Sequence, residues 1–157
     1  MSQTPSLLIR PACPADCDGL ALLVGKYWSH EAIPAFDRGL VTRLLQQFLA
    51  RPELGTCWVA EEAGRLCGYL VACYVFSLEH GGVMAELDEL FVLEELRSAG
   101  LGARLVRAAE ADMARAGIVR VQLQVAVGNR RAHAFYGRLG FAARSGYALW
   151  DRALPAR

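Results

Sequence analysis

The chain has 157 residues, with 17 basic and 16 acidic side chains and a formal net charge of +1. This balance argues against bulk binding of nucleic acid, which usually needs a basic stripe. No apolar run approaches the ~18 residues that a membrane helix needs, so no membrane partner is expected. The length predicts a single domain over residues 1–157, with a core at 7–152 and a loose tail at 153–157.

The cysteines and the N-terminus indicate a cytoplasmic protein. The five cysteines are an odd number, form no C-x-x-C pair, and three of them fall in predicted strands. Reduced thiols are therefore expected rather than disulfides or a zinc site, and no metal is expected. The first ten residues lack a basic segment followed by an apolar core, so we expect no signal peptide.

The first half of the chain predicts alternating strands and helices. In chain order they are a strand at 7–10, helices at 15–27 and 40–49, and strands at 56–61 and 66–78 joined by a turn at 62–65. Asp37 is a candidate cap for the second helix, which stops before Pro52. Between the two helices, residues 26–34 break the helical period and predict a loop or an irregular helix.

The stretch 86–106 predicts a buried strand, a glycine loop and a helix in succession. A strand is expected at 87–93, the loop at 97–102 and the helix at 102–116. Such a loop gathers free N–H groups at the positive end of the helix dipole, which favours an anion. Arg97 adds a forked donor set suited to phosphate. A phosphate site is one interpretation, and a tight turn before a surface helix is the other.

The second half predicts a parallel strand pair followed by a closing hairpin. A strand at 119–127 follows the helix, which implies a right-handed crossover. Asn129 is expected to cap a further helix, and short strands are expected at 141–145 and 147–150. The fold class is therefore α/β with a mixed sheet: an antiparallel meander, a parallel βαβ unit and a C-terminal hairpin. A cleft is expected where the pairing changes from antiparallel to parallel.

Two motifs carry a resemblance to a known family. The first is Arg97-x-x-Gly100-x-Gly102, and the second is Asn129-x-x-Ala132-x-x-Phe135-Tyr136-x-x-x-Gly140-Phe141. In this order they resemble the GNAT superfamily of acetyl-CoA-dependent N-acetyltransferases. A dinucleotide fingerprint does not fit, because Leu105 occupies its third small position, and no lysine follows the glycines as in a P-loop.

The resemblance implies a GNAT-like fold with a splayed strand pair that holds acetyl-CoA as cosubstrate. The loop would hold the pyrophosphate, the main chain of the strand before it would pair with the pantetheine arm, and Asn129 would hold the arm or the mouth of the gap. The cofactor-binding residues that it implies are Phe91, Val92, Leu93, Arg97, Ser98, Ala99, Gly100, Leu101, Gly102, Ala103, Asn129 and Tyr136.

The same resemblance implies direct transfer to a primary amine, with two catalytic side chains. Glu89 would take the proton of the amine, itself or through water, because an amine must be neutral to attack the thioester. Tyr136 would protonate the departing thiolate. On plain alternation Glu89 shares a face with Leu87 and Phe91, and a bulge would break that count. Glu86, Asp88 and Glu94 remain alternatives for this role, and a carboxylate strand that simply faces water is a further interpretation.

The acceptor is expected to be a small-molecule amine rather than a protein. An acidic cluster of Glu79, Glu86, Asp88 and Glu89 hints at a cationic acceptor, and the substrate-binding candidates are Trp28, His30, Glu86 and Asp88. A homodimer is a family-based expectation. The rival hypothesis is a catalytically silent acyl-CoA-binding or partner-binding domain of the same fold. A toxin that acetylates charged tRNA is a third, and the near-neutral charge speaks against it.

Overall fold

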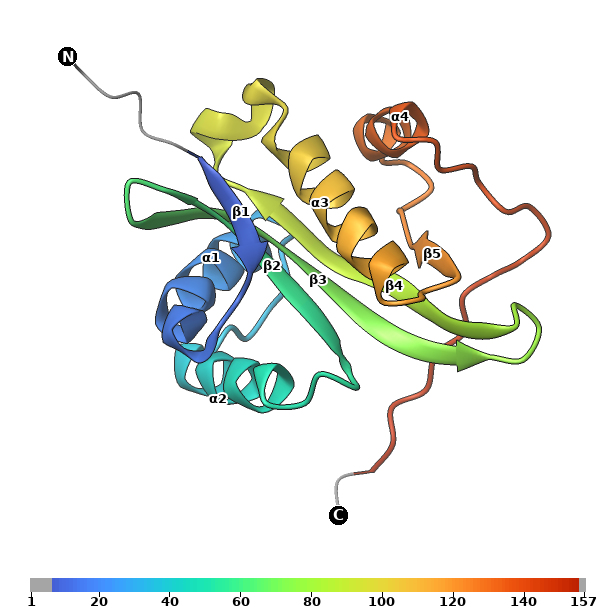
Figure 1. Cartoon of the computed structure of the whole chain (residues 1–157), viewed down its shortest axis with the longest axis horizontal. Helices are drawn as coiled ribbons and strands as arrows, with labels where there is room; N and C mark the ends of the chain where they lie inside the picture. The colour runs from blue at the N-terminus through green and yellow to red at the C-terminus, as the bar shows by residue number, and fades with distance from the viewer. Residues whose placement is uncertain (1–6, 156–157) are drawn as a thin grey trace. The chain divides into compact units, whose positions relative to one another are not determined.

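The computed structural model describes residues 7–155, so the end of the predicted tail, 156–157, lies outside it. The described chain forms two compact units, which are treated separately. The first ends at Gln124 and the second begins at Val125. The first unit is built on a five-stranded sheet in the order β1-β2-β3-β4-β5 (Figure 1).

The sheet is mixed, as the sequence predicts. Neighbours from β1 to β4 are antiparallel, and β4 pairs with β5 in parallel. The turn between β2 and β3 contains Ala63 (φ 49°) and Gly64 (φ 77°), two positive φ values in succession, as hairpin turns of this length favour. The strands are β1 Leu8–Pro11, β2 Gly55–Glu62, β3 Arg65–Ser77, β4 Gly82–Val92 and β5 Arg120–Leu123.

The helices confirm most of the predicted order and correct one segment. Asp37 caps α2 as predicted, its Oδ1 accepting from the Leu40 N–H at 2.8 Å. The prediction that irregular structure begins at residue 26 is wrong, because α1 continues as a regular helix to His30. The chain leaves the helical conformation only near Ala32, whose φ is 53°. The first unit holds the 3₁₀ turns η1 Pro14–Asp16 and η2 Glu94–Ala99 and the helices α1 Cys17–His30, α2 Arg38–Leu49 and α3 Leu101–Arg115; the second holds α4 Arg130–Arg138.

Helices cover both faces of the sheet: α1 and α2 lie on one face and α3 on the other (Figure 1). Trp58, 1% exposed, belongs to the α3 face, where its Nε1 donates to Asp112 Oδ2 at 2.7 Å. Gly68 lies on the same face, and a Cβ there would come within 3.2 Å of Leu105. Leu70, which pairs with Trp58, lies on this face too, so Tyr69, between Gly68 and Leu70 on β3, points to the opposite face, which α1 covers.

A β-bulge interrupts β4 at Asp88. Opposite β3, Glu89 pairs with Val71 and Leu87 pairs with Ala72, so Asp88 is the extra residue. After the bulge the alternation is reset, and Glu86, Glu89 and Phe91 share the face covered by α1. The bulge breaks the plain alternation, as the sequence analysis allows: Glu89 still shares a face with Phe91, but it lies on the face of Glu86 and not on that of Leu87.

The parallel pair separates early. β4 and β5 are paired only from Met84↔Arg120 to Leu87↔Leu123, while β4 runs on to Val92. The strand expected at 119–127 is four residues long in this structure, since the pairing that defines it ends at Leu123.

The C-terminal hairpin expected at 141–150 is absent from the described residues, which carry only a turn there. Tyr147, Leu149 and Trp150 are 74%, 74% and 91% exposed. Alternating apolar side chains do not make a strand without a sheet edge to pair with and a surface to cover. In the described part of the chain, no helix is long and apolar enough to cross a membrane.

Candidate active site

Glu89 lies at the centre of a polar contact set on the α1 face of the sheet. The hydroxyl of Tyr69 on β3 donates to Glu89 Oε2 at 2.7 Å. The indole Nε1 of Trp28 on α1 donates to Glu89 Oε1 at 3.4 Å. The two carboxylate oxygens are therefore each held by a donor from a different element.

Burial raises the pKa of the Glu89 carboxyl above its ordinary value, and the charge of Asp88 raises it further. The hydrogen bonds from Tyr69 and Trp28 act in the opposite direction, because they stabilise the ionised form. Burial, followed by the negative charge of Glu89, raises the pKa of the Tyr69 hydroxyl, which stays protonated and able to donate.

Further aromatic rings pack against the two donors of this carboxylate or against Phe91. Phe91 contacts Tyr27 and Tyr69, with ring centroids 6.3 Å and 6.2 Å away. Trp28 meets Phe36 edge to face at 5.8 Å. Trp28, a predicted substrate-binding residue, is in direct contact with Glu89, the predicted base.

Beyond the bulge, β4 has an edge that β5 does not cover. The Leu93 N–H donates to Cys67 on β3, at 2.9 Å. Because successive strand amides point to opposite sides, Leu90 and Val92 direct their backbone groups away from β3. The Val92 carbonyl accepts from Arg97 Nε at 3.0 Å, and the Arg97 guanidinium lies 5.4 Å from the centroid of the Phe91 ring.

The loop after β4 ends in the N-terminus of α3. Gly100 has φ 73° and ψ 13°, a left-handed conformation that favours glycine, and α3 begins at Leu101. The first bond of this helical turn runs from the Arg104 N–H to the Gly100 carbonyl at 3.1 Å. The amides of residues 101–103 precede it and have no intrahelical acceptor. Residues 97–99, predicted as loop, lie in η2.

The other predicted acceptor residues differ in their surroundings. Glu86 accepts from Gln122 Nε2 at 3.1 Å and Gln124 Nε2 at 2.8 Å, so its carboxylate is tied to the β5 side. Asp88 is exposed at the bulge, although partial burial and the charge of Glu86 raise the pKa of its carboxyl. His30 is exposed at the end of α1.

Asn129 and Tyr136 belong to the second unit. Asn129 caps α4, as predicted: its Oδ1 accepts from the Ala132 N–H at 3.0 Å. The Tyr136 ring contacts Phe135 and Phe141, with centroids 4.9 Å and 5.7 Å away. Their roles toward acetyl-CoA and the thiolate stay predictions.

Tyr69 is the site residue that the sequence analysis missed. The only signal was a hydroxyl-bearing aromatic inside an otherwise apolar strand next to the strand with the carboxylates. Among the described residues, no group of His, Cys, Asp and Glu has the arrangement needed to hold a metal ion.

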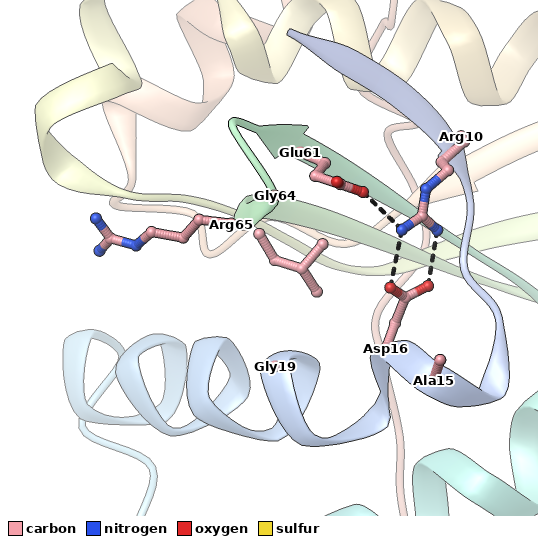
Figure 2. Close-up of a pocket in the computed structure, with 8 residues that line it drawn as sticks. Arg10, Ala15, Asp16, Gly19, Glu61, Gly64 and Arg65 are labelled. Carbon is pink, nitrogen blue, oxygen red and sulfur yellow. Dashed lines mark hydrogen bonds and ion pairs between the residues drawn. The ribbon is translucent and has the colours of Figure 1, made fainter. Parts of the chain in front are cut away.

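A separate hollow lies between β1, η1 and the β2–β3 turn (Figure 2). Arg10 donates to both oxygens of Asp16, at 2.7 and 2.9 Å, and to Glu61 at 2.7 Å. Figure 2 shows Arg65 directed away from this cluster. Arg10 is thus shared between two carboxylates, and these three hydrogen-bonded side chains, with a net charge of −1, form a structural ion network beside the hollow.

The mixed sheet, its splayed parallel pair and the glycine turn at the start of α3 define an acetyltransferase fold. A family model described as "Acetyltransferase (GNAT) family" matches residues 23–141, more than half of the chain. The chain therefore belongs to the GNAT acetyltransferases and is an acetyltransferase enzyme.

One curated relative and two solved structures are similar to this chain. An aminoalkylphosphonate N-acetyltransferase of Salmonella typhimurium (strain LT2) is 28% identical over 138 residues, 87% of this chain and 86% of the relative. An integron cassette protein from the Cole Harbour salt marsh metagenome has a TM-score of 0.82 and 26% identity, covering 95% of this chain and 91% of that one. An aminoglycoside acetyltransferase from an uncultured soil sample shares the fold, with a TM-score of 0.80 at 18% identity, covering 95% and 97% of the two chains.

Proposed function

We propose that this acetyltransferase moves an acetyl group from acetyl-CoA to the primary amine of a small molecule, by direct transfer in a ternary complex. One observation carries the proposal: a half-buried carboxylate, Glu89, is held by two donors next to the uncovered edge of β4. The site thus combines a proton acceptor with a strand edge that can pair with an extended amide chain.

Acetyl-CoA suits the groups that the chain offers. The free amides at the start of α3 favour a pyrophosphate, and Gly100 lets the main chain turn there. The backbone groups of Leu90 and Val92 on the uncovered edge can pair with the amides of the pantetheine arm. Arg97 uses its Nε to hold the Val92 carbonyl, so its terminal nitrogens are the part that can reach a phosphate.

Glu89 accepts a proton from the bound amine, directly or through a water. Burial raises the pKa of its carboxyl, which brings it closer to the pKa of the group that it must deprotonate. The N–H of Val92 is the strand donor best directed to stabilise charge on an oxygen at the uncovered edge. Tyr136 donates the proton that the departing thiolate needs.

The acceptor is proposed to be a small cationic amine. Glu86, Asp88 and Glu89 place negative charge along β4, which attracts an ammonium group. The names of two relatives fit a small amine acceptor, since aminoalkylphosphonates and aminoglycosides both carry amines, although only the aminoglycosides are net cations. A cytoplasmic location and a homodimer stay predictions.

The first experiment measures thiol release from acetyl-CoA against a panel of polyamines, aminoglycosides, aminoalkylphosphonates and amino-acid derivatives. With an active acceptor, Glu89→Gln and Tyr136→Phe should each lower kcat by roughly 100-fold, the usual size of general acid–base catalysis. Two matched controls remove an exposed carboxylate (Glu53→Gln) and an exposed hydroxyl (Tyr147→Phe), and both should leave the rate unchanged.

The outcomes separate the assignments. An unchanged rate in Glu89→Gln moves the base to another carboxylate or to a water chain, and an unchanged rate in Tyr136→Phe removes the general acid. Tight binding of acetyl-CoA with no turnover on any amine, protein lysines included, contradicts the proposal and favours a silent binding domain.

A further inference from the structure

Packing of the ring does not explain why residue 69 is a tyrosine with a buried hydroxyl. Tyr69 is 0% exposed and its ring packs beside Phe91, a position that phenylalanine would fill equally well. Burying a hydroxyl costs free energy unless it finds a partner. The hydrogen bond found for this hydroxyl in the described chain goes to Glu89 Oε2, at 2.7 Å.

Glu89 receives a second donor from a different part of the fold. The Trp28 indole reaches Oε1 from α1, while Tyr69 reaches Oε2 from β3. A glutamate side chain with one free oxygen can rotate about its last torsion, whereas one with both oxygens held cannot. Each oxygen still keeps a lone pair, so the carboxylate is oriented and remains able to accept a proton.

We propose that Tyr69 is the positioning residue for Glu89: with the Trp28 N–H it keeps the carboxylate ionised and in one orientation. The orientation follows from these contacts alone. What the carboxylate then does for acetyl transfer rests on the proposed function.

The charge state of Glu89 follows from the balance of these contacts with their surroundings. Burial favours the neutral acid, and the two donors favour the carboxylate. Without the Tyr69 donor, burial acts against fewer opposing contacts, so the carboxyl must bind its proton at a higher pH. Other titratable groups interact electrostatically with this cluster. They are Asp88 and Glu86 on β4, Cys73 on β3, Cys57 on β2 and Tyr27 on α1.

The experiment titrates Glu89 in the folded protein by carbon-13 NMR of labelled glutamate carboxyls, with Glu89→Gln identifying the signal. Tyr69→Phe keeps the ring and should move the Glu89 midpoint to higher pH. Trp28→Phe should move it in the same direction by less, because the 3.4 Å bond is longer. Tyr74→Phe is the matched control, since this β3 hydroxyl bonds Thr56 at 2.8 Å, and it should move nothing.

A kinetic measurement then links the titration to turnover. On the acidic limb of the pH profile, Tyr69→Phe should lower kcat/KM roughly tenfold, the size of one hydrogen bond to a charged group, with little change at high pH. A uniform loss at all pH values would show a merely structural role and overturn the proposal.

An unmoved Glu89 midpoint in folded Tyr69→Phe overturns it as well. Should that variant not fold, an unmoved midpoint in Trp28→Phe has the same meaning, and a shift to higher pH supports the proposal. A parent protein that acetylates no amine counts against the proposed function, while the NMR titration still decides the role of Tyr69.

Discussion

The ion network at Arg10 makes the stability of the protein depend on pH in a defined window. Asp16 is 8% exposed, and it accepts two hydrogen bonds from Arg10 and a third from the Cys13 N–H at 2.8 Å. The Arg10 hydrogen bonds are the main reason that the pKa of the Asp16 carboxyl falls from 3.8 to about 2. Replacing the charge by Asp16→Asn should therefore destabilise the folded state at neutral pH.

The size of the effect follows from the shift. A change of nearly two pKa units corresponds to roughly 2 kcal/mol at ~1.36 kcal/mol per unit. The Arg10 side chain keeps 30% exposure, so solvent screening reduces this value. We expect Asp16→Asn to lower the free energy of unfolding by about 1–2 kcal/mol at pH 7.

The sign of the pH dependence is fixed by linkage. The folded-state pKa of Asp16 lies below the unfolded value, so the unfolded chain takes up the proton first as the pH falls. The stabilisation is complete above pH ~4 and is lost as the pH falls to about 2. The difference between the parent and Asp16→Asn should shrink over that window.

Urea unfolding at a series of pH values from 7 to about 2.5 measures this difference. Glu53→Gln removes the carboxylate of the exposed Arg51–Glu53 pair, whose side chains are 60% and 62% exposed, and it should leave the stability nearly unchanged at every pH. Equal stability of parent and Asp16→Asn at pH 7 would refute the reasoning. So would a difference that is as large at the acidic end as at pH 7.

Three further substitutions test the turn, the helix connection and the core. Gly100→Ala should cost about 1 kcal/mol and weaken acetyl-CoA binding in calorimetry, whereas Gly64→Ala, also at positive φ, should cost as much stability and leave binding unchanged. Ala32→Gly relieves the strain of a φ of 53° and should raise the free energy of unfolding by about 0.5 kcal/mol. Ala50→Gly is its control: at φ −78° there is no strain to relieve, so the added freedom of glycine in the unfolded chain should lower the free energy of unfolding. Trp58→Phe removes a buried hydrogen bond to α3 together with core volume, and urea unfolding should show a loss of roughly 2–3 kcal/mol; a loss below about 1 kcal/mol would contradict that role.

Local chemistry made much of the fold predictable. Asp37 and Asn129 each cap the helix that follows by accepting from an N–H three residues ahead, so the signal lies within one turn of chain. The hairpin at 62–65 depends on a short polar turn between two apolar runs. The antiparallel order of β1 to β4 follows from such turns, and the parallel pairing of β5 follows from the length of the crossover.

The contacts of Glu89 could not be predicted in the same way. Trp28 lies 61 residues from Glu89 in sequence and Tyr69 lies 20 residues away, so neither contact leaves a local pattern. Both depend on the register between β3 and β4 and on the position of α1. Arg97 is a related case: its Nε bonds the Val92 carbonyl of the preceding strand, a contact that the motif does not predict, and its role at a phosphate stays a prediction.

The bulge at Asp88 connects these observations. By adding one residue, it turns Glu89 to the face that Glu86 already occupies, where Tyr69 and Trp28 can reach it. A bulge also increases the twist of its strand, and the pairing of β4 with β5 ends at Leu87, the residue immediately before it. One irregularity in β4 therefore places the proposed base between its two donors, and it lies at the point where the pairing of β4 with β5 ends.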